Sequence, residues 1–142
     1  MPTSFKHPPP RPHLSRNELK VLLVDDDSFQ LELISEILRG LGINSITQAS
    51  SGAQALQAMS NKQHSFNLLV MDLHMPGMDG FQFMESVARD GFNGALIIVS
   101  GQSADVMRAA SLVAQLRRFT LLGSVPKPVG RAALSELLSK LA

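Results

Sequence analysis

Hydrophobic residues along the chain alternate between two patterns, which together predict five strand–helix pairs. Short, largely apolar runs have the length of buried β-strands, and they cover residues 20–24, 66–71, 95–99 and 120–125, with residues 43–48 as a weaker strand candidate. Each run is followed by apolar residues spaced three and four apart, as in an amphipathic helix. These helices are predicted from Asp27 to Gly40 or Gly42, from Ser51 past Met59, from Asp79 through Arg89, from Ser103 to about Arg118, and around Leu134, Leu137, Leu138 and Leu141.

Polar residues that can cap a helix precede the first three predicted helices. Asp27 and Asp79 each stand just before an apolar stripe, where a carboxylate can accept a hydrogen bond from the first free backbone N–H groups. Ser51 and Gln54 have the spacing of a capping box. We therefore expect Asp27 and Asp79 to act first of all as helix caps.

The strand runs do not alternate between apolar and polar residues, which indicates strands covered on both faces. Strands of this kind, each followed by a helix, predict an α/β fold with a mainly parallel sheet wrapped by helices. With 142 residues, the chain is too short for an eight-stranded barrel of about 250 residues. An open, doubly wound, five-stranded parallel sheet remains, and such sheets bind ligands at the carboxyl ends of their strands.

Composition separates a tail from the predicted domain. Five of the eight prolines lie in the first twelve residues, so residues 1–17 are predicted to be a disordered Pro-rich tail, with residues 18–142 forming the domain. The tail carries three basic residues and no acid, whereas residues 18–142 carry 10 basic and 12 acidic side chains. This balance argues against direct nucleic-acid binding by the domain.

Several classes of protein are excluded or disfavoured. The chain has no cysteine, which excludes disulfide scaffolds, zinc–thiolate sites and thiol nucleophiles. No run of about 18 apolar residues is present and the first residues lack a signal-peptide core, so neither a membrane span nor secretion is expected. The expected location is cytoplasmic.

The residues at the predicted strand ends carry the candidate chemistry. Asp25 and Asp26 follow the first strand, Asp72 the third, Ser100 the fourth, and Lys127 the fifth. Each alone could be an ordinary loop or surface residue. Three neighbouring carboxylates, however, repel one another unless a cation joins them. Oxygen ligands without thiolate suit Mg²⁺ or Mn²⁺, and a phosphoryl group could bind beside such an ion, the Lys127 ammonium and the Ser100 hydroxyl.

Four segments resemble the receiver domain of two-component response regulators, and the resemblance covers all five strand–helix units. The segments are Val24-Asp25-Asp26, the run from Met71 to Gly80 (M-D-L-H-M-P-G-M-D-G), Val99-Ser100-Gly101 and Val125-Pro126-Lys127-Pro128. The resemblance implies the flavodoxin-like strand order 2-1-3-4-5.

The resemblance also implies roles for the strand-end residues. Asp72 corresponds to the phosphoacceptor, and Asp25 and Asp26 to the acidic pair that organises the metal. His74 stands where a backbone carbonyl completes the metal shell. Ser100 and Lys127 correspond to the hydroxyl and the ammonium that contact the phosphoryl group, so Asp72 and Lys127 are the expected catalytic pair, and the bond from Lys127 to Pro128 is often cis in this family.

Two positions depart from the family pattern. Ser124 stands where the family often has a Tyr or Phe that turns inward on activation, and the chain has no Tyr. Pro126 removes a backbone donor near the end of the last strand. We expect the switch to act through loop movement and the fourth helix instead. A weaker similarity to receivers that precede cyclic-di-GMP phosphodiesterase (EAL) domains lies in residues 99–102 and 119–128.

The resemblance predicts a signalling domain that catalyses only its own phosphorylation and dephosphorylation. A sensor histidine kinase or a phosphotransfer protein would supply the phosphoryl group. The face formed by the fourth helix, fifth strand and fifth helix would then contact an output domain or a second copy, with no membrane involved. No output motif follows within the chain, so either a stand-alone receiver or part of a longer protein is expected. Two alternatives stay open: an unphosphorylated pseudo-receiver that only binds proteins, and a small aspartyl-phosphate phosphatase.

Overall fold

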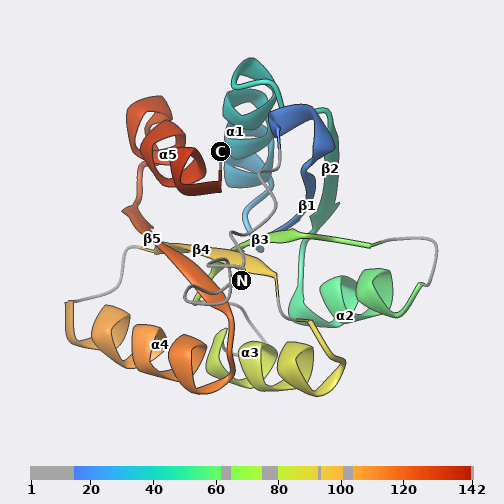
Figure 1. Ribbon diagram of the computed structural model, residues 1–142, viewed down its shortest axis with the longest axis vertical. Coiled ribbons are helices and arrows are strands. Elements are labelled where there is room, and N and C mark those ends of the chain that lie inside the picture. Colours follow the sequence, from blue (N-terminus) through green and yellow to red (C-terminus); the bar gives the residue numbers. More distant parts are fainter. Residues whose placement is uncertain (1–14, 62–64, 75–79, 93, 101–103, 142) are drawn as a thin grey trace, which may run out of the picture.

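A five-stranded, fully parallel sheet forms the centre of the molecule. The computed structural model describes residues 15–61, 65–74, 80–92, 94–100 and 104–141 (Figure 1). The strands are β1 (Lys20–Val24), β2 (Ser45–Ala49), β3 (Leu68–Asp72), β4 (Ala95–Ser100) and β5 (Thr120–Pro126). Their order in the sheet is β2-β1-β3-β4-β5, with every neighbouring pair parallel. The predicted doubly wound fold and its strand order are confirmed.

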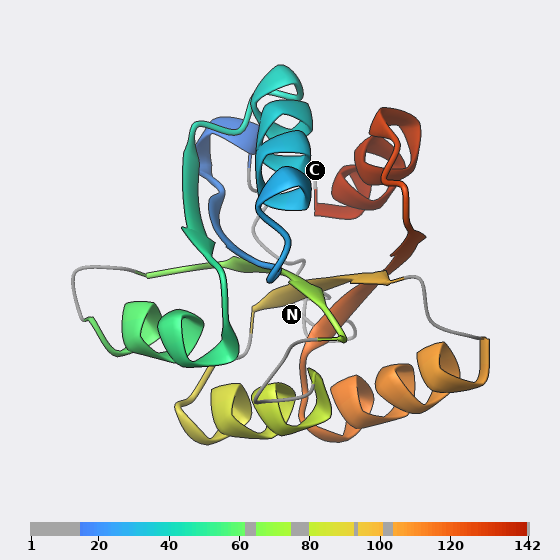
Figure 2. The same cartoon turned by 180° about the vertical axis from the view of Figure 1, so that it is seen from behind.

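Five helices cover the sheet in two layers, as Figures 1 and 2 show. They are α1 (Ser28–Gly40), α2 (Gly52–Ser60), α3 (Gly80–Arg89), α4 (Ala104–Leu116) and α5 (Arg131–Leu138), with the short 3-10 turns η2 (Arg16–Glu18) and η3 (Ser139–Leu141). Helices α1 and α5 lie on one face, and α2, α3 and α4 on the other. Successive strand residues alternate between these faces, which explains the continuous apolar runs: Val21 and Leu23 pack under α1, whereas Leu22 and Val24 belong to the opposite core.

Two of the predicted caps form as expected, with one difference. The Asp27 carboxylate accepts a hydrogen bond from the Phe29 N–H (2.9 Å) and begins α1. Ser51 Oγ accepts from the Gln54 N–H (3.1 Å), which is the first bond of the predicted capping box. The second bond differs, because the Gln54 side chain accepts from the Ser50 N–H (2.8 Å) and not from the Ser51 N–H. Asp79 and Ser103, the predicted starts of two later helices, lie outside the described residues.

The fifth strand contains a bulge that the sequence pattern did not reveal. The register shifts by one residue between Leu96 and Ile97 on β4, which leaves Leu122 of β5 without a direct partner. Gly123 follows with a φ of +153°, and a side chain there would meet Leu137 at 2.6 Å. The Lys140 ammonium donates to the Leu122 carbonyl (2.8 Å) and so satisfies the bulged residue.

The described chain begins before the predicted domain boundary. Residues 16 and 17, which we assigned to the tail, belong to turn η2, and Arg16 donates to the Leu41 carbonyl (3.1 Å) because it packs beside the end of α1. Residues 16 and 17 are thus ordered in contact with the domain, while the boundary at residue 18 stays a prediction. The rest of the predicted tail, residues 1–14, lies outside the described part of the chain. None of the helices that the structure describes is long and apolar enough to cross a membrane.

Candidate functional site

The carboxyl ends of four strands bring the predicted site residues to one edge of the sheet. Asp25 directly follows β1, Asp72 is the last residue of β3, Ser100 ends β4, and Lys127 directly follows β5. All strands run in the same direction, so these positions share an edge. The strand register pairs Asp72 with Val99, which places Ser100 one residue beyond Asp72 on the neighbouring strand.

Lys127 bridges two buried carboxylates at this edge. Its Nζ lies 2.9 Å from Asp72 Oδ2 and 3.1 Å from Asp25 Oδ2. The two aspartates are only 4% and 1% exposed, whereas the lysine side chain is 24% exposed. A single ammonium therefore offsets two carboxylates in a largely water-excluded place.

A third carboxylate joins this pair from the solvent side. Ligand oxygens of Asp25, Asp26 and Asp72 all lie within 4.8 Å of one another, and Asp26 is exposed. The close approach predicted from the sequence is thus present in the fold. Charges at such distances repel by a few kcal/mol at the effective dielectric of a partly buried site, on the order of 3 kcal/mol for a pair.

Backbone amides fix the orientation of both buried carboxylates. Asp25 Oδ1 accepts from the Asp27 N–H (2.9 Å), and Asp72 Oδ1 accepts from the His74 N–H (3.1 Å). Each aspartate thus bonds the amide two residues ahead, a common turn arrangement. Because each Oδ1 is held in this way, each Oδ2 is the oxygen that faces Lys127.

Burial and ion pairing shift two of the pKa values in the site. Burial raises the pKa of Asp25 above its usual value, and the hydrogen bond from Asp27 only partly opposes this. For Lys127, burial acts to lower the pKa, but the contacts with Asp72 and Asp25 outweigh it, and the pKa is raised. The site therefore favours the charged form of Lys127, whereas burial disfavours the charged form of Asp25 and so reduces the stability of the folded state when Asp25 is ionised.

The donor set fits a hard divalent cation. Asp25 Oδ2 is fully buried, and its partner among the described residues is the Lys127 ammonium at 3.1 Å, an ion pair without the geometry of a good hydrogen bond. A buried, charged oxygen without a hydrogen bond, beside two further carboxylates, offers the all-oxygen coordination that Mg²⁺ and Mn²⁺ prefer. Asp25, Asp26 and Asp72 could therefore hold such an ion.

The remaining predicted residues lie at the same edge. His74 is exposed, and its backbone N–H is already used by Asp72, whereas the coordination expected of its carbonyl stays a prediction. Ser100 is buried at the end of β4, opposite Pro126 in the sheet register. The peptide bond between Lys127 and Pro128 is cis, as the family resemblance implied.

Gly80 has a structural role that sequence analysis missed. Its N–H donates to the Leu73 carbonyl (2.9 Å), and a Cβ at this position would lie 2.7 Å from the Leu73 Cα. The first turn of α3 therefore rests directly on the residue that follows Asp72. The only sequence signal was the glycine after Asp79, because the close approach depends on how α3 packs against β3.

The two departures from the family pattern lie on an edge strand. Ser124 and Pro126 are both exposed on β5, which has a neighbour on one side only. A proline at the end of an edge strand costs little, because its missing N–H need not break an internal ladder. The structure thus explains how Pro126 is tolerated.

Comparison with known proteins identifies the family. A model described as the response regulator receiver domain matches residues 21–139. A probable chemotaxis protein CheY of Rhizobium etli is 38% identical over 99 residues, which cover 67% of this chain and 75% of that protein. Chemotaxis protein CheY-3 of Vibrio cholerae is 29% identical over 132 residues, covering 90% of this chain and 94% of that protein.

A solved structure supports the fold alone. The crystal structure of the CheX-CheY-BeF3-Mg²⁺ complex from Borrelia burgdorferi aligns with a TM-score of 0.75 at 23% identity, over 87% of this chain and 90% of that one. The sheet order, the acidic edge and the extent of the family match agree with one another. This chain belongs to the response regulator receiver domain family, the signalling domains of two-component systems.

Proposed function

We propose that this receiver accepts a phosphoryl group on Asp72 from a phosphohistidine of a sensor histidine kinase or phosphotransfer protein. One observation carries the proposal: Lys127 bridges the buried Asp72 and Asp25 at the carboxyl edge of the sheet. A structural ion pair would need one carboxylate for one ammonium. An edge with three carboxylates and one ammonium instead suits a site that binds further positive charge and a phosphoryl group.

The proposed chemistry is an in-line displacement at phosphorus. A carboxylate oxygen of Asp72 attacks, the new O–P bond forms as the N–P bond of the donor breaks, and the donor imidazole keeps the electron pair. The His74 N–H, which already holds Asp72 Oδ1, fixes the orientation of the nucleophile. Lys127 and the Ser100 hydroxyl would donate hydrogen bonds to phosphoryl oxygens.

The metal site of the proposal consists of Asp25, Asp26 and Asp72, with the His74 backbone carbonyl added by analogy with the family. Bound Mg²⁺, or Mn²⁺, would supply positive charge beside the phosphoryl oxygens. The orientation of Asp25 suits metal binding. The Asp27 N–H holds its Oδ1, and its Oδ2 has no hydrogen bond among the described residues and so can serve as a ligand. Binding a cation would favour the charged form of Asp25, which burial disfavours.

The proposed consequence is a shift between two conformations of the domain, which switches a partner rather than turning over a metabolite. By family analogy, the face formed by α4, β5 and α5 would contact an output domain or a second copy. Ser124 has no ring that could turn inward, so loop movement together with α4 would carry the signal in this chain.

The test is Mg²⁺-dependent labelling of the full chain with acetyl phosphate. We expect hydroxylamine-sensitive label on the wild-type protein, since an acyl phosphate forms, and none on Asp72→Asn. Asp105→Asn is the matched control, because Asp105 is an exposed carboxylate paired with Arg108 on α4, and it should label like the wild type. Equal labelling of the Asp72→Asn variant would refute the assignment. If the wild type is not labelled, the pseudo-receiver alternative is supported. If it steadily hydrolyses phosphorylated metabolites, the phosphatase alternative is supported.

A further inference from the structure

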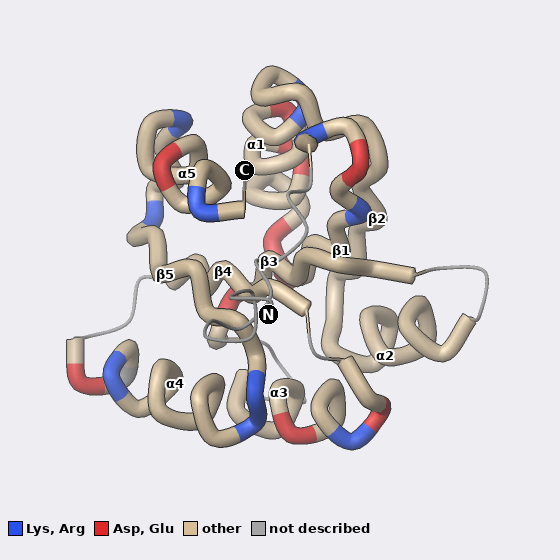
Figure 3. Tube along the Cα trace, viewed as in Figure 1, with Lys and Arg blue, Asp and Glu red and all other residues tan. Residues whose placement is uncertain are grey.

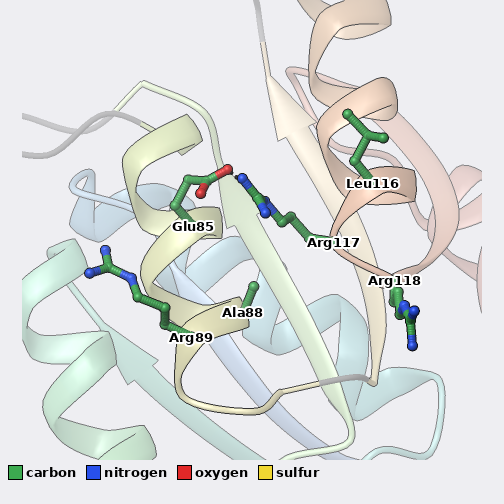
Figure 4. Close-up of a pocket in the computed structure, with 6 residues that line it drawn as sticks. All are labelled: Glu85, Ala88, Arg89, Leu116, Arg117 and Arg118. Carbon is green, nitrogen blue, oxygen red and sulfur yellow. Dashed lines mark hydrogen bonds and ion pairs between the residues drawn. The ribbon is translucent and has the colours of Figure 1, made fainter.

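A hollow of about 490 Å³ lies between the ends of α3 and α4, far from the acidic edge. Glu85, Ala88, Arg89, Leu116, Arg117 and Arg118 line it (Figure 4). In a parallel α/β sheet the helices run opposite to the strands, so their last turns lie at the amino edge of the sheet. The hollow is therefore at the edge opposite Asp72 and takes no part in the proposed phosphoryl transfer.

The basic residues of the hollow are only partly neutralised. Arg117 Nε lies 2.7 Å from Glu85 Oε1 and forms an ion pair across the gap between the helices. Among the described residues, neither Arg89 nor Arg118 has an acidic side chain within ion-pair distance. Figure 4 shows these two arginines on opposite sides of the hollow, with the Arg117–Glu85 pair between them. Arg89 and Arg118 are thus both exposed, on either side of a neutral pair, and the blue segments in Figure 3 mark Lys and Arg positions at the ends of α3 and α4.

Arg118 occupies a backbone position that favours glycine. Helix α4 ends in a Schellman motif, in which the Phe119 N–H bonds the Ala114 carbonyl (3.0 Å) and the Arg118 N–H bonds the Gln115 carbonyl (3.1 Å). This motif places Arg118 in the left-handed conformation, with a φ of 65°, and no other described non-glycine residue has a positive φ.

Two other helices of the same molecule end in the same motif, and both use glycine. Gly42 ends α1 with a φ of 97°, and Gly91 ends α3 with a φ of 89°. Glycine adopts this conformation without the steric penalty of a Cβ. The motif at the end of α4 therefore does not need an arginine, and the strain at Arg118 points to a use of its side chain outside the fold.

We propose that the hollow between α3 and α4 binds an acidic segment of a partner protein, with Arg89 and Arg118 contacting its carboxylates. Apolar side chains of that segment would pack on Leu116, which is 77% exposed, and on Leu112, one turn earlier on α4 and 61% exposed. Exposed leucines beside unpaired arginines match an acidic, partly apolar chain, since guanidinium groups pair well with carboxylates.

Other anions fit these observations less well. A single small anion is too small to cover the exposed Leu112 and Leu116 as well as the arginines. A nucleic acid would meet a domain whose residues 18–142 carry more acidic than basic side chains. Neither of these ligands would use the two exposed leucines.

Unfolding measurements on the full chain test the strain. Arg118→Gly should lower the unfolding equilibrium constant by about three-fold, since the relief of strain exceeds the extra freedom that glycine gives the unfolded chain. Gly91→Arg is the matched control, because a Cβ there meets no atom within 4 Å and the residue is also in the left-handed conformation. It should raise the constant by about three-fold. A less stable Arg118→Gly variant would show that the arginine serves the fold, which would overturn the proposal.

Binding is tested by NMR with a ten-residue peptide of glutamates around two leucines. It should shift amide signals of residues 85–89 and 116–118, and Arg118→Gly should bind it about five-fold more weakly. Arg118→Lys, which keeps the charge, should retain part of the affinity, and Arg39→Ala on α1 should bind like the wild type. Equal binding of a peptide with glutamine for glutamate, tighter binding of a twelve-nucleotide oligothymidylate, or undiminished binding by Arg118→Gly would overturn the proposal.

Discussion

Replacing Lys127 by methionine should destabilise the metal-free protein in a strongly pH-dependent way. The substitution keeps most of the side-chain volume but removes the ammonium that lies 2.9 Å from Asp72 and 3.1 Å from Asp25. Both carboxylates are almost fully buried, so water cannot replace the lost charge.

The size of the effect follows from these distances. At an effective dielectric of about 20, each contact with the ammonium is worth roughly 5 kcal/mol of attraction, and the repulsion left between two carboxylates is roughly 3 kcal/mol. The cost of burying the ammonium offsets much of the attraction. The variant can also protonate one aspartate, which near pH 7 costs at most about 4 kcal/mol, about 1.4 kcal/mol for each pH unit above the usual pKa. We therefore expect a loss of about 3 kcal/mol near pH 7 and about 1 kcal/mol near pH 5.

Urea unfolding with a metal chelator, at about pH 7 and about pH 5, measures this loss. Lys20→Met is the control, because Lys20 is exposed, its side chain contacts no acid among the described residues, and such surface changes stay within about 0.5 kcal/mol. Excess Mg²⁺ should restore much of the stability of the Lys127→Met variant, since it would bind the carboxylates that the lysine left. A loss under about 1 kcal/mol at neutral pH, or one that does not change with pH, would refute the electrostatic account of this site.

Three further changes test other parts of the structure. Without metal, Asp25→Asn should stabilise the protein near pH 7 and not in acid. Burial raises the folded pKa of Asp25, so the wild type loses stability as the pH rises from the usual value of 3.8 through the folded pKa, and the unfolding curves of the two proteins should converge in acid. Gly80→Ala should cost about 2 kcal/mol or more and slow labelling by acetyl phosphate, because its Cβ would lie 2.7 Å from the Leu73 Cα, and unchanged labelling would contradict this. Phe83→Ala should cost about 3 to 5 kcal/mol in thermal or urea unfolding, since the side chain, on the inner face of α3, is fully buried in the core against the sheet.

Local sequence patterns were sufficient to predict the elements, because each strand and helix is coded by neighbouring residues. The apolar run of residues 20–24 matches β1 to the residue, and Asp27 caps α1 as expected. Strand β3 ends at Asp72, one residue beyond the predicted run, because Asp72 pairs with Val99 of the neighbouring strand. The bulge at Leu122 escaped prediction, since it depends on the register with β4 and on the fit of Gly123 against Leu137.

The sequence predicted which residues form the site and at which strand ends they lie, but not which of them contact one another. A carboxylate after a strand and a lysine after another can be read from the chain, and parallel strands require them to share an edge. Three features could not be predicted in this way. They are the ion pairs of one ammonium with both Asp25 and Asp72, the Asp25 oxygen without a hydrogen bond, and the close approach of Gly80 to Leu73. They join residues on different strands or helices, and their distances depend on packing.

The sequence by itself thus determined five strand–helix units, the parallel sheet and the residues at its carboxyl edge, because backbone propensity and hydrophobic period act over short stretches of chain. Only the tertiary structure decided that Lys127 neutralises two carboxylates at once and that Arg118 stands where α1 and α3 use glycine. The first feature joins segments far apart in the sequence, so the packing of the strands decides which charges meet. The second depends on where α4 ends and β5 begins, which sets the residue that must adopt the left-handed conformation.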